Sequence, residues 1–245
     1  MKIMSIFGTR PEIIRLSRIF PLLDANFQHV MVNTNQNFTP ELNSIFFSEL
    51  EIRKPDYNLK IKTGQFGKEI AEIISQTEKI IIKEKPDIML ILGDTNSGLS
   101  AIVAAHYGIK IVHLEAGMRA YDFRMPEDKN RTLIDHLSSI LLPYTNYSRE
   151  NLIRENIHPS KIYVVGNPII EVIDYFLPKI QKSKILEKMK LKEKEYVLVT
   201  AHRSENVDDE NNLKKIFSSL EKINKKFKKR VIYPMHPRTL SKIKN

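Results

Sequence analysis

The sequence predicts an α/β protein in which a parallel sheet is covered by helices on both faces. Strand-length apolar runs alternate with helix-length amphipathic runs from the start of the chain, as they do in successive βαβ units. The apolar runs are hydrophobic almost without interruption, which is typical of strands buried on both sides. A hydrophobic content of 42% over 245 residues is enough to fill such a core.

The predicted strands are short apolar segments bounded by polar residues, glycine or proline. Their spacing leaves room for a helix between most successive strands, which favours parallel pairing. In chain order they are Lys2 to Phe7, His29 to Asn33, Ile88 to Leu92, Lys110 to Leu114, Ile162 to Val165, Tyr196 to Thr200 and Val231 to Tyr233.

The predicted helices follow from apolar residues spaced three and four apart. One series runs from Ile13 through Leu16 and Phe20 to Leu23, and a second from Ile70 to Ile80. Two further helices are expected over Asn96 to Tyr107 and Glu127 to Ile140, and Gly108 follows the first of them as a helix-ending glycine.

A lysine-rich stretch from Pro178 to Glu195 indicates a domain boundary, because a new strand begins directly after it. We therefore expect an N-terminal domain over residues 1–177, followed by a linker and part of a second domain over residues 178–245. That second part supplies two strands and one full helix, too few to bury both faces of a sheet. Further residues or another chain would have to complete it.

The formal charge of +10 raises the question of a nucleic-acid partner. The basic excess is concentrated in two segments, Lys179 to Glu195 and Lys214 to Arg230. The aromatic residues of the second segment, Phe217 and Phe227, lie at helical spacing from other apolar residues, unlike a base-stacking surface. A solvated lysine-rich face is therefore favoured, and no nucleic-acid partner is expected.

Other classes of protein are disfavoured by what the sequence lacks. No apolar run reaches membrane-spanning length and no signal-peptide pattern follows Met1, so we expect a cytoplasmic protein without membrane contact. The absence of cysteine excludes disulfides, thiolate zinc sites and a cysteine nucleophile. Neither a metal nor a cofactor is expected, because HExxH, GxGxxG and GxxxxGK[ST] do not occur.

Polar residues follow four of the predicted strands, at the carboxyl end where open parallel sheets bind ligands. Because these ends share one edge of a sheet, the turns present acids and cations to a common region. The four turns are Gly8-Thr9-Arg10-Pro11, Gly93-Asp94-Thr95, Glu115-Ala116-Gly117 and His202-Arg203.

The first of these turns leads into a helix whose free amides and dipole suit an anion. Arg10 and Arg15 add two positive charges, so a phosphate is one interpretation of the turn. The alternative is that Gly8 only relieves steric crowding between strand and helix, which is the commoner reason for such a glycine.

The carboxylates after the next two strands allow similar alternatives. Asp94 either caps the helix that begins near Asn96 or takes part in catalysis. Glu115 would be costly to bury without a partner, and Arg119 offers a nearby countercharge that would keep it ionised.

A further group of polar residues lies on the helix that begins at Pro126. Glu127 is favoured in the first turn by the helix dipole, and it is followed by Asn130 and Arg131. An ordinary i, i+4 ion pair between Glu127 and Arg131 is an equally good explanation of these two residues. His202 and His236, each after a second-domain strand, would singly be structural more often than catalytic.

Taken together, these motifs resemble the non-hydrolysing UDP-N-acetylglucosamine 2-epimerases. The segments that match in order and spacing are Phe7 to Glu12, Gly93 to Thr95, His113 to Arg119, Pro126-Glu127, Asn130-Arg131, Gly166-Asn167, Thr200 to Arg203 and Pro234 to Pro237. Asn35 to Asn37, Glu41 to Asn43 and Ile52 to Asp56 resemble the branch of the family that serves capsule and O-antigen sugars. The substrate stays open among UDP-N-acetylglucosamine, its uronic acid derivatives and 6-deoxy sugars.

The resemblance implies a fold and a reaction. The fold is two Rossmann-like domains of the GT-B type, with the second domain incomplete here. The reaction inverts C2 of a UDP-linked N-acetylhexosamine by elimination and re-addition of UDP, and relatives that catalyse it are commonly homodimers. The resemblance assigns catalysis to Asp94, Glu115, Glu127 and His202. It assigns substrate binding to Arg10, Arg15, Arg119, Asn130, Arg131, Arg203 and His236.

Two other functions fit the same resemblance. The first is an inactive or merely sugar-nucleotide-binding fragment, because the family's later second-domain residues that hold uridine and ribose are absent from this sequence. The second is a GT-B glycosyltransferase, which would need an acceptor and would not exchange the C2 proton of its donor. An epimerase must exchange that proton.

Overall fold

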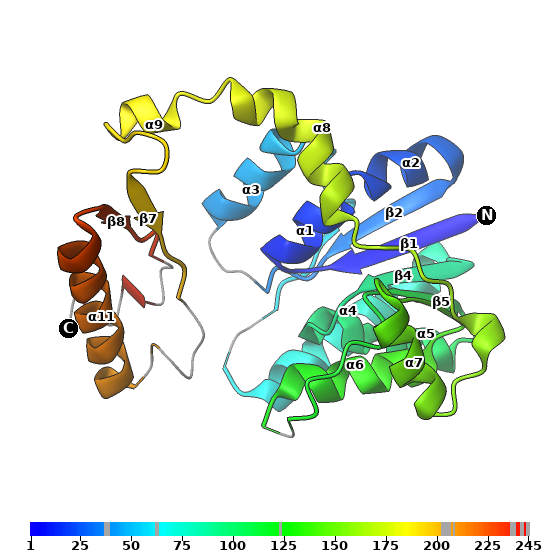
Figure 1. The fold of residues 1–245 in the computed structure, drawn as a ribbon. Coiled ribbons are helices and arrows are strands. Elements are labelled where there is room, and N and C mark those ends of the chain that lie inside the picture. Colours follow the sequence, from blue (N-terminus) through cyan, green and yellow to red (C-terminus); the bar gives the residue numbers. More distant parts are fainter. Residues whose placement is uncertain are drawn as a thin grey trace. The chain divides into compact units, whose positions relative to one another are not determined.

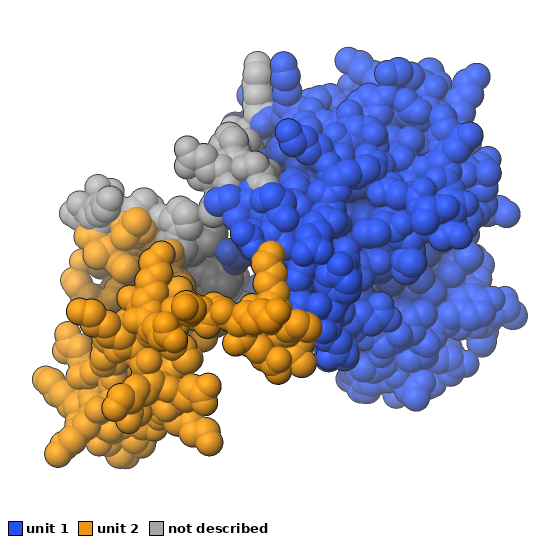
Figure 2. Space-filling model, turned by 90° about the horizontal axis from the view of Figure 1, so that it is seen from above, with its two compact units in different colours: residues 1–176 blue, residues 177–245 orange. Residues whose placement is uncertain are grey.

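In the computed structural model the chain divides into two compact units, residues 1–176 (unit 1) and residues 177–245 (unit 2), as Figure 2 shows. The described residues are 1–36, 40–61, 64–122, 124–201, 207, 209–235, 239–240 and 243, with the backbone alone described for 40–44. Within these residues no helix combines the length and the apolar character needed to cross a membrane.

Unit 1 contains a six-stranded sheet with the order β3-β2-β1-β4-β5-β6, and every pair of neighbouring strands is parallel. The strands are β1 (Lys2–Phe7), β2 (Gln28–Asn33), β3 (Tyr57–Asn58), β4 (Ile88–Leu92), β5 (Lys110–Leu114) and β6 (Ile140–Leu142). The order reverses at β1, which pairs with β2 on one side and β4 on the other. Ligands of doubly wound sheets bind beyond the carboxyl ends of the strands at such a reversal.

Helices cover both faces of this sheet, as expected (Figure 1). On one face lie α4 (Phe66–Glu84), α5 (Ala101–His106) and α6 (Pro126–Leu137), and on the other α1 (Arg10–Leu16), α2 (Ile19–Asn26) and α3 (Pro40–Glu49). Successive strand residues enter opposite cores, so that Ile6 packs in the first and Phe7 in the second. Both cores are apolar, which explains why the strand sequences are continuously hydrophobic.

The helix expected from Ile13 to Leu23 is interrupted, and the structure has α1 and α2 in its place. Pro21 has no N–H for the carbonyl of Ser17, and its ring would clash with that carbonyl in a continuous helix. The freed Ser17 carbonyl accepts a hydrogen bond from Arg18 Nε at 3.1 Å instead. The apolar series is nevertheless buried, with Ile13 and Phe20 fully inaccessible to solvent.

The end of α6 differs from the expectation. The helix was expected to run to Ile140, but it ends at Leu137, and Ile140–Leu142 forms β6. Ser138 donates its hydroxyl to the carbonyl of Ile134 at 2.7 Å and closes the last turn. The helix was predicted too long because Ile140 continues the apolar spacing of α6. The strand expected at Ile162 to Val165 is wrong, because only Ile162 makes a bridge, to Leu141 of β6.

The remaining elements of unit 1 are mostly short. The helix expected over Asn96 to Tyr107 is a 3-10 segment, η1 (Asn96–Ser100), that continues into α5, and Gly108 follows with φ +69°. After β6 come α7 (Asn146–Arg154), η2 (Pro159–Lys161) and α8 (Ile169–Gln181), which runs into unit 2.

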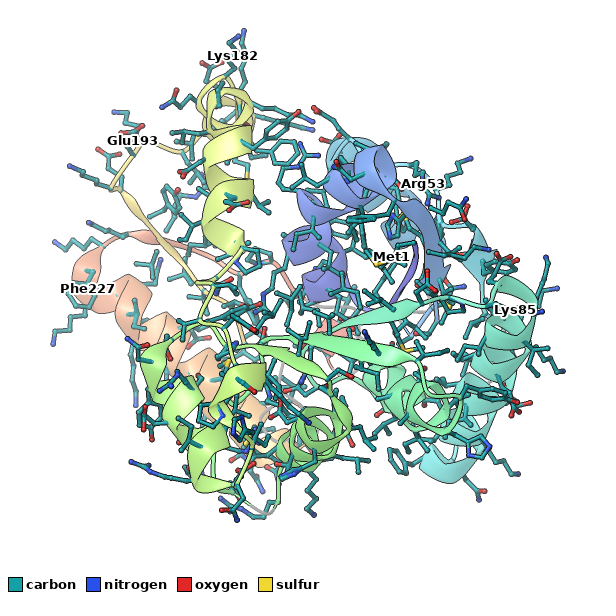
Figure 3. All side chains as sticks on the ribbon, turned by 90° about the vertical axis from the view of Figure 1, so that its right-hand side faces the viewer. Met1, Arg53, Lys85, Lys182, Glu193 and Phe227 are labelled. Atoms are coloured by element: carbon teal, nitrogen blue, oxygen red, sulfur yellow. The ribbon has the colours of Figure 1, made fainter. Side chains whose placement is uncertain are left out.

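Unit 2 contains α9 (Ile185–Lys188), β7 (Tyr196–Leu198), α11 (Glu210–Phe227) and β8 (Arg230–Ile232). β7 and β8 pair in parallel, so the two strands predicted in this part are confirmed, with β7 shorter than predicted and β8 shifted by one residue. In the lysine-rich stretch the charged side chains extend away from the ribbon, as Lys182 and Glu193 do in Figure 3. A solvated basic face is what such side chains form.

Candidate active site

One buried carboxylate, that of Glu12, holds the turns after β1 and β4 together. It accepts the backbone N–H groups of Gly8 and Thr9 at 3.0 and 2.7 Å and the Thr95 hydroxyl at 2.9 Å. Burial raises the pKa of the Glu12 carboxyl above its ordinary value, and these hydrogen bonds offset part of the rise. The backbone N–H groups of Gly8 and Thr9, just before the helix expected to bind an anion, are therefore occupied by Glu12. The Thr9-x-x-Glu12 spacing of a capping box was the signal that could have shown this.

Replacing Glu12 with glutamine is expected to remove a pH-dependent loss of stability. Because the pKa of Glu12 is raised on folding, wild-type stability falls as the pH rises from the ordinary carboxyl pKa through the raised one. Glutamine buries no charge and keeps one oxygen for the two backbone amides. Urea unfolding at about pH 5 and about pH 8 should show a smaller loss between the two pH values in the variant. Equal losses in both proteins would contradict the raised pKa.

Arg131 of α6 joins the carboxylates that follow β4 and β5. Its guanidinium pairs with the Asp94 carboxylate and with Glu115 Oε1 at 3.2 Å, and it also donates to the Glu115 carbonyl at 3.0 Å. The Arg131 side chain is 7% exposed. Burial acts to lower its pKa, but the charges of Asp94 and Glu115 outweigh burial and raise it. Arg131 is thus a fixed cation between two strand ends.

Glu115 is bound by cations on both carboxylate oxygens. Arg131 holds Oε1, and Arg15 of α1 pairs with Oε2. The backbone at Glu115 has φ +67°, a left-handed conformation that is unusual for a residue with a side chain and common at functional sites. Arg15 and Arg131 are therefore its countercharges, and the expectation that Arg119 plays this part is wrong.

Arg119 lies in a separate buried ion-pair group. Its guanidinium pairs with Asp135 at 2.8 Å and with Glu155 at 2.6 Å, and its side chain is 2% exposed. Burial acts to lower the pKa of Arg119, but the Glu155 hydrogen bonds and the Asp135 charge raise it. A side chain held in this way contributes to the structure beneath the turn that carries Glu115, and binding of substrate by Arg119 remains a prediction.

Three other predicted site residues are not part of the ion-pair cluster of Asp94, Arg131 and Glu115. Asn130 donates to the carbonyl of Asp94 at 3.1 Å, which adds a second link between α6 and the turn after β4. Arg10 is exposed, with its guanidinium 6.0 Å from the centre of the Phe46 ring. Glu127 is exposed in the first turn of α6. The i, i+4 ion pair between Glu127 and Arg131 is not formed, because the Arg131 guanidinium pairs with Asp94 and Glu115 instead.

Three of the predicted residues, His202, Arg203 and His236, lie outside the described residues. Within the described ranges, no group of three or more histidine, aspartate or glutamate side chains is arranged to hold a metal ion.

Tyr144 is a residue near the site that sequence reasoning missed. It lies two residues after β6, the neighbour of β5, and its buried hydroxyl has no hydrogen-bond partner among the described residues. Burial, and after it the negative charge of Glu115, raise the pKa of the Tyr144 phenol. The signal was a polar aromatic residue just beyond a strand, and it was missed because β6 was not predicted: Ile140 was placed at the end of a helix and the next two residues were left unassigned.

Replacing Tyr144 with phenylalanine is expected to leave the free energy of unfolding unchanged or to raise it by ~1 kcal/mol. The reason is that the hydroxyl is desolvated and makes no hydrogen bond of ordinary geometry, although the Glu115 carboxylate lies near it. The matched control is Tyr57→Phe, which removes a hydroxyl that donates to the Glu84 carboxylate and should cost ~1–2 kcal/mol. Urea unfolding of both variants is the measurement, and an equal loss in the two would show that Tyr144 has a partner in the folded protein.

Comparison with known proteins gives a consistent family. A family model described as UDP-N-acetylglucosamine 2-epimerase matches residues 23–245. A UDP-N-acetylglucosamine 2-epimerase of Methanococcus maripaludis is 41% identical over 247 residues, covering 99% of this chain and 67% of that protein. A UDP-2,3-diacetamido-2,3-dideoxy-D-glucuronate 2-epimerase of Pseudomonas aeruginosa is 35% identical, covering 98% of this chain and 68% of that protein.

Solved structures agree with these relatives. The Methanocaldococcus jannaschii UDP-GlcNAc 2-epimerase in complex with UDP-GlcNAc and UDP has a TM-score of 0.92 and 39% identity, covering 100% of this chain and 68% of that one. The Rickettsia bellii UDP-N-acetylglucosamine 2-epimerase has a TM-score of 0.92 and 41% identity, and the match covers 100% of this chain and 64% of that one. The chain thus spans about two thirds of the length of these relatives. The expected fold class is confirmed, with the second domain present in part.

Proposed function

This chain belongs to the UDP-N-acetylglucosamine 2-epimerase family, and from that premise we propose that the full-length protein inverts C2 of a UDP-linked N-acetylhexosamine. The observation that supports this most directly is the cluster of Asp94, Arg131 and Glu115. In it, carboxylates from two neighbouring strand ends meet on one buried guanidinium, beside the reversal of strand order where such sheets bind ligands.

The proposed reaction needs one group that takes a proton and one that returns it. As the C2–H and C1–O bonds break, a C1–C2 double bond forms and UDP leaves with the bonding electrons. UDP then re-forms the C1–O bond while a proton is added to the opposite face of C2. Asp94 and Glu115 are the carboxylates supported for these transfers by their place in the cluster. Glu127 and His202 are the further candidates.

Arg15 couples the leaving group to the base in this proposal. In the free protein its guanidinium pairs with Glu115 Oε2, and its side chain is 30% exposed. A pyrophosphate that arrives near Arg15 and Arg10 carries more charge than one carboxylate and competes for the same fork of donors. Arg15 would then turn to the pyrophosphate and release Oε2 for proton abstraction, while Arg131 keeps hold of Oε1.

The finer parts of the proposal rest on the family resemblance. They are a homodimer, a cytoplasmic location and a role in surface polysaccharide synthesis. The Pseudomonas aeruginosa relative is named for a diacetamido-glucuronate, which supports including modified sugars beside UDP-N-acetylglucosamine among the candidate substrates.

The test is exchange of the C2 proton in D2O, followed by NMR with UDP-N-acetylglucosamine and its 2,3-diacetamido uronate analogue as separate substrates. The full-length protein should incorporate deuterium at C2, and Asp94→Asn and Glu115→Gln should each slow the exchange by about 10²- to 10⁴-fold. Glu84→Gln is the matched control, because Glu84 pairs with Lys2, far from the carboxyl ends of the strands. Undiminished exchange would remove the changed residue from the mechanism. Absence of exchange in the wild type would overturn the proposed epimerase function.

A further inference from the structure

His113 is enclosed between two hydrogen-bond acceptors. Its Nε2 lies 2.8 Å from the carbonyl oxygen of Gly93, and its Nδ1 lies 2.7 Å from Oδ1 of Asp135. Both side chains are 0% exposed. A carbonyl oxygen only accepts, so Nε2 must carry a proton. The charge of the ring then depends on whether Asp135 is ionised.

The surroundings of Asp135 favour its ionised form. Its Oδ2 accepts the backbone N–H of Gly117 at 3.1 Å and pairs with Arg119 at 2.8 Å. The charges of Arg119 and Arg131 act against protonation of the Asp135 carboxylate, independently of the state of His113. An ionised Asp135 offers only lone pairs to Nδ1, which therefore also carries a proton.

The pair connects the two turns that carry the candidate catalytic carboxylates. Gly93, bonded to His113, directly precedes Asp94, and Gly117, bonded to Asp135, follows Glu115 by two residues. Arg131 joins the same two turns through their side chains. His113 and Asp135 thus fix the backbones whose side chains Arg131 holds, and a small displacement of reacting groups is enough to lower a rate strongly.

A second histidine–aspartate pair in unit 1 provides a contrast. His29 Nδ1 lies 2.7 Å from Asp24, but its Nε2 lies 2.8 Å from the Ser5 hydroxyl, which can donate as well as accept. This ring has no need of a second proton, and burial lowers the pKa of His29. His29 lies near the amino end of β2, at the opposite edge of the sheet from the carboxylate cluster.

We propose that His113 and Asp135 form a buried imidazolium–carboxylate pair that positions Asp94 and Glu115 for the reaction. The positioning role rests on the proposed epimerase function, whereas the charge of the pair does not. The groups that face it come from four elements: the carbonyl of Gly93 after β4, Gly117 and Arg119 after β5, Arg131 of α6 and, through Arg119, Glu155 after α7.

The charge is tested by long-range proton–nitrogen NMR of the 15N-labelled full-length protein at about pH 8. Both ring nitrogens of His113 should show imidazolium shifts, while His29 should show one protonated and one bare nitrogen. His113→Gln and His29→Gln assign the two sets of signals. A neutral His113 ring overturns the proposal.

Positioning is tested with Asp135→Asn and His113→Gln, and His29→Gln is the matched control. The first two variants should lower kcat for C2 exchange by about 10- to 100-fold with KM within about threefold of the wild type, and the control should change neither. They should also shift the side-chain carboxyl 13C signals of Asp94 and Glu115. Amide spectra verify folding, and His113→Gln keeps a donor for the Gly93 carbonyl if Asp135→Asn does not fold.

The outcomes separate this inference from the proposed function. If the wild type shows no C2 exchange, the proposed function fails and the carboxyl signals alone decide the positioning role. If those signals are unmoved in both variants, or if His29→Gln lowers kcat as much as His113→Gln does, the positioning role is overturned.

Discussion

Replacing Arg131 with methionine is expected to abolish C2 exchange and to lower the free energy of unfolding by ~3–5 kcal/mol. The guanidinium is the shared partner of Asp94 and Glu115, and its side chain is almost completely buried. Methionine fills part of the volume but leaves the Asp94 and Glu115 carboxylates without their shared cation, and among the described residues Arg15 remains paired with Glu115. Urea unfolding measures the stability, and NMR in D2O measures the exchange.

The matched control is Arg124→Met, in which an arginine–aspartate pair is removed from the surface. Arg124 pairs with Asp122, but its side chain is 90% exposed, so both the free energy of unfolding and the exchange should be nearly unchanged. Arg131→Lys keeps the charge without the planar fork of donors and should fall between the two. A similar loss of stability for Arg131→Met and Arg124→Met would show that the buried pairs are not formed in solution.

Gly117→Ala is expected to destabilise the protein by ~3 kcal/mol, the sum of a backbone penalty and a steric one. The glycine has φ +73°, and an added Cβ would lie 2.2 Å from the carbonyl oxygen of Ser148 and 2.7 Å from Leu152 Cγ. The turn cannot move aside easily. Its N–H is bonded to Asp135, and its carbonyl accepts from Asn151 at 2.9 Å.

Gly108→Ala separates the two contributions to this loss. Gly108 has a nearly equal φ of +69°, but nothing lies within 4 Å of an added Cβ, so only the backbone penalty of ~1 kcal/mol applies. Thermal or urea unfolding of both variants gives the difference. Equal losses would mean that α7 moves away from the turn and that Gly117 is needed for its conformation alone.

The sequence predicted the sheet best where strands are buried on both faces. β1, β4 and β5 have the predicted bounds, because an uninterrupted apolar run of that length fits no other local structure bounded by polar turns. β3 has only two residues, too few to form a pattern. β6 was not predicted, because its first residue, Ile140, continues the apolar spacing of the preceding helix and the strand has only three residues.

The sequence predicted which residues of the candidate site stand at the ends of strands, but it did not predict which of them contact one another. The position of Asp94 and Glu115 after adjacent strands followed from the alternation of apolar and polar segments, and the pairing of β4 with β5 brings the two ends together. The choice of partners could not be predicted. Arg119 is four residues from Glu115 yet pairs with Asp135, while Arg131 reaches Glu115 from the next helix and Arg15 reaches it from the first helix of the chain.

The amino-acid sequence alone determined which segments become strands, which residues stand at their carboxyl ends and which family the motifs resemble, because these depend on short-range periodicity and on the order of residues. Only the tertiary structure decided which charges meet. Ion pairs such as Arg15 with Glu115 and His113 with Asp135 join side chains from different elements, 100 residues apart in the first case and 22 in the second. Their formation depends on how helices pack against a completed sheet, and no local pattern of residues records that packing.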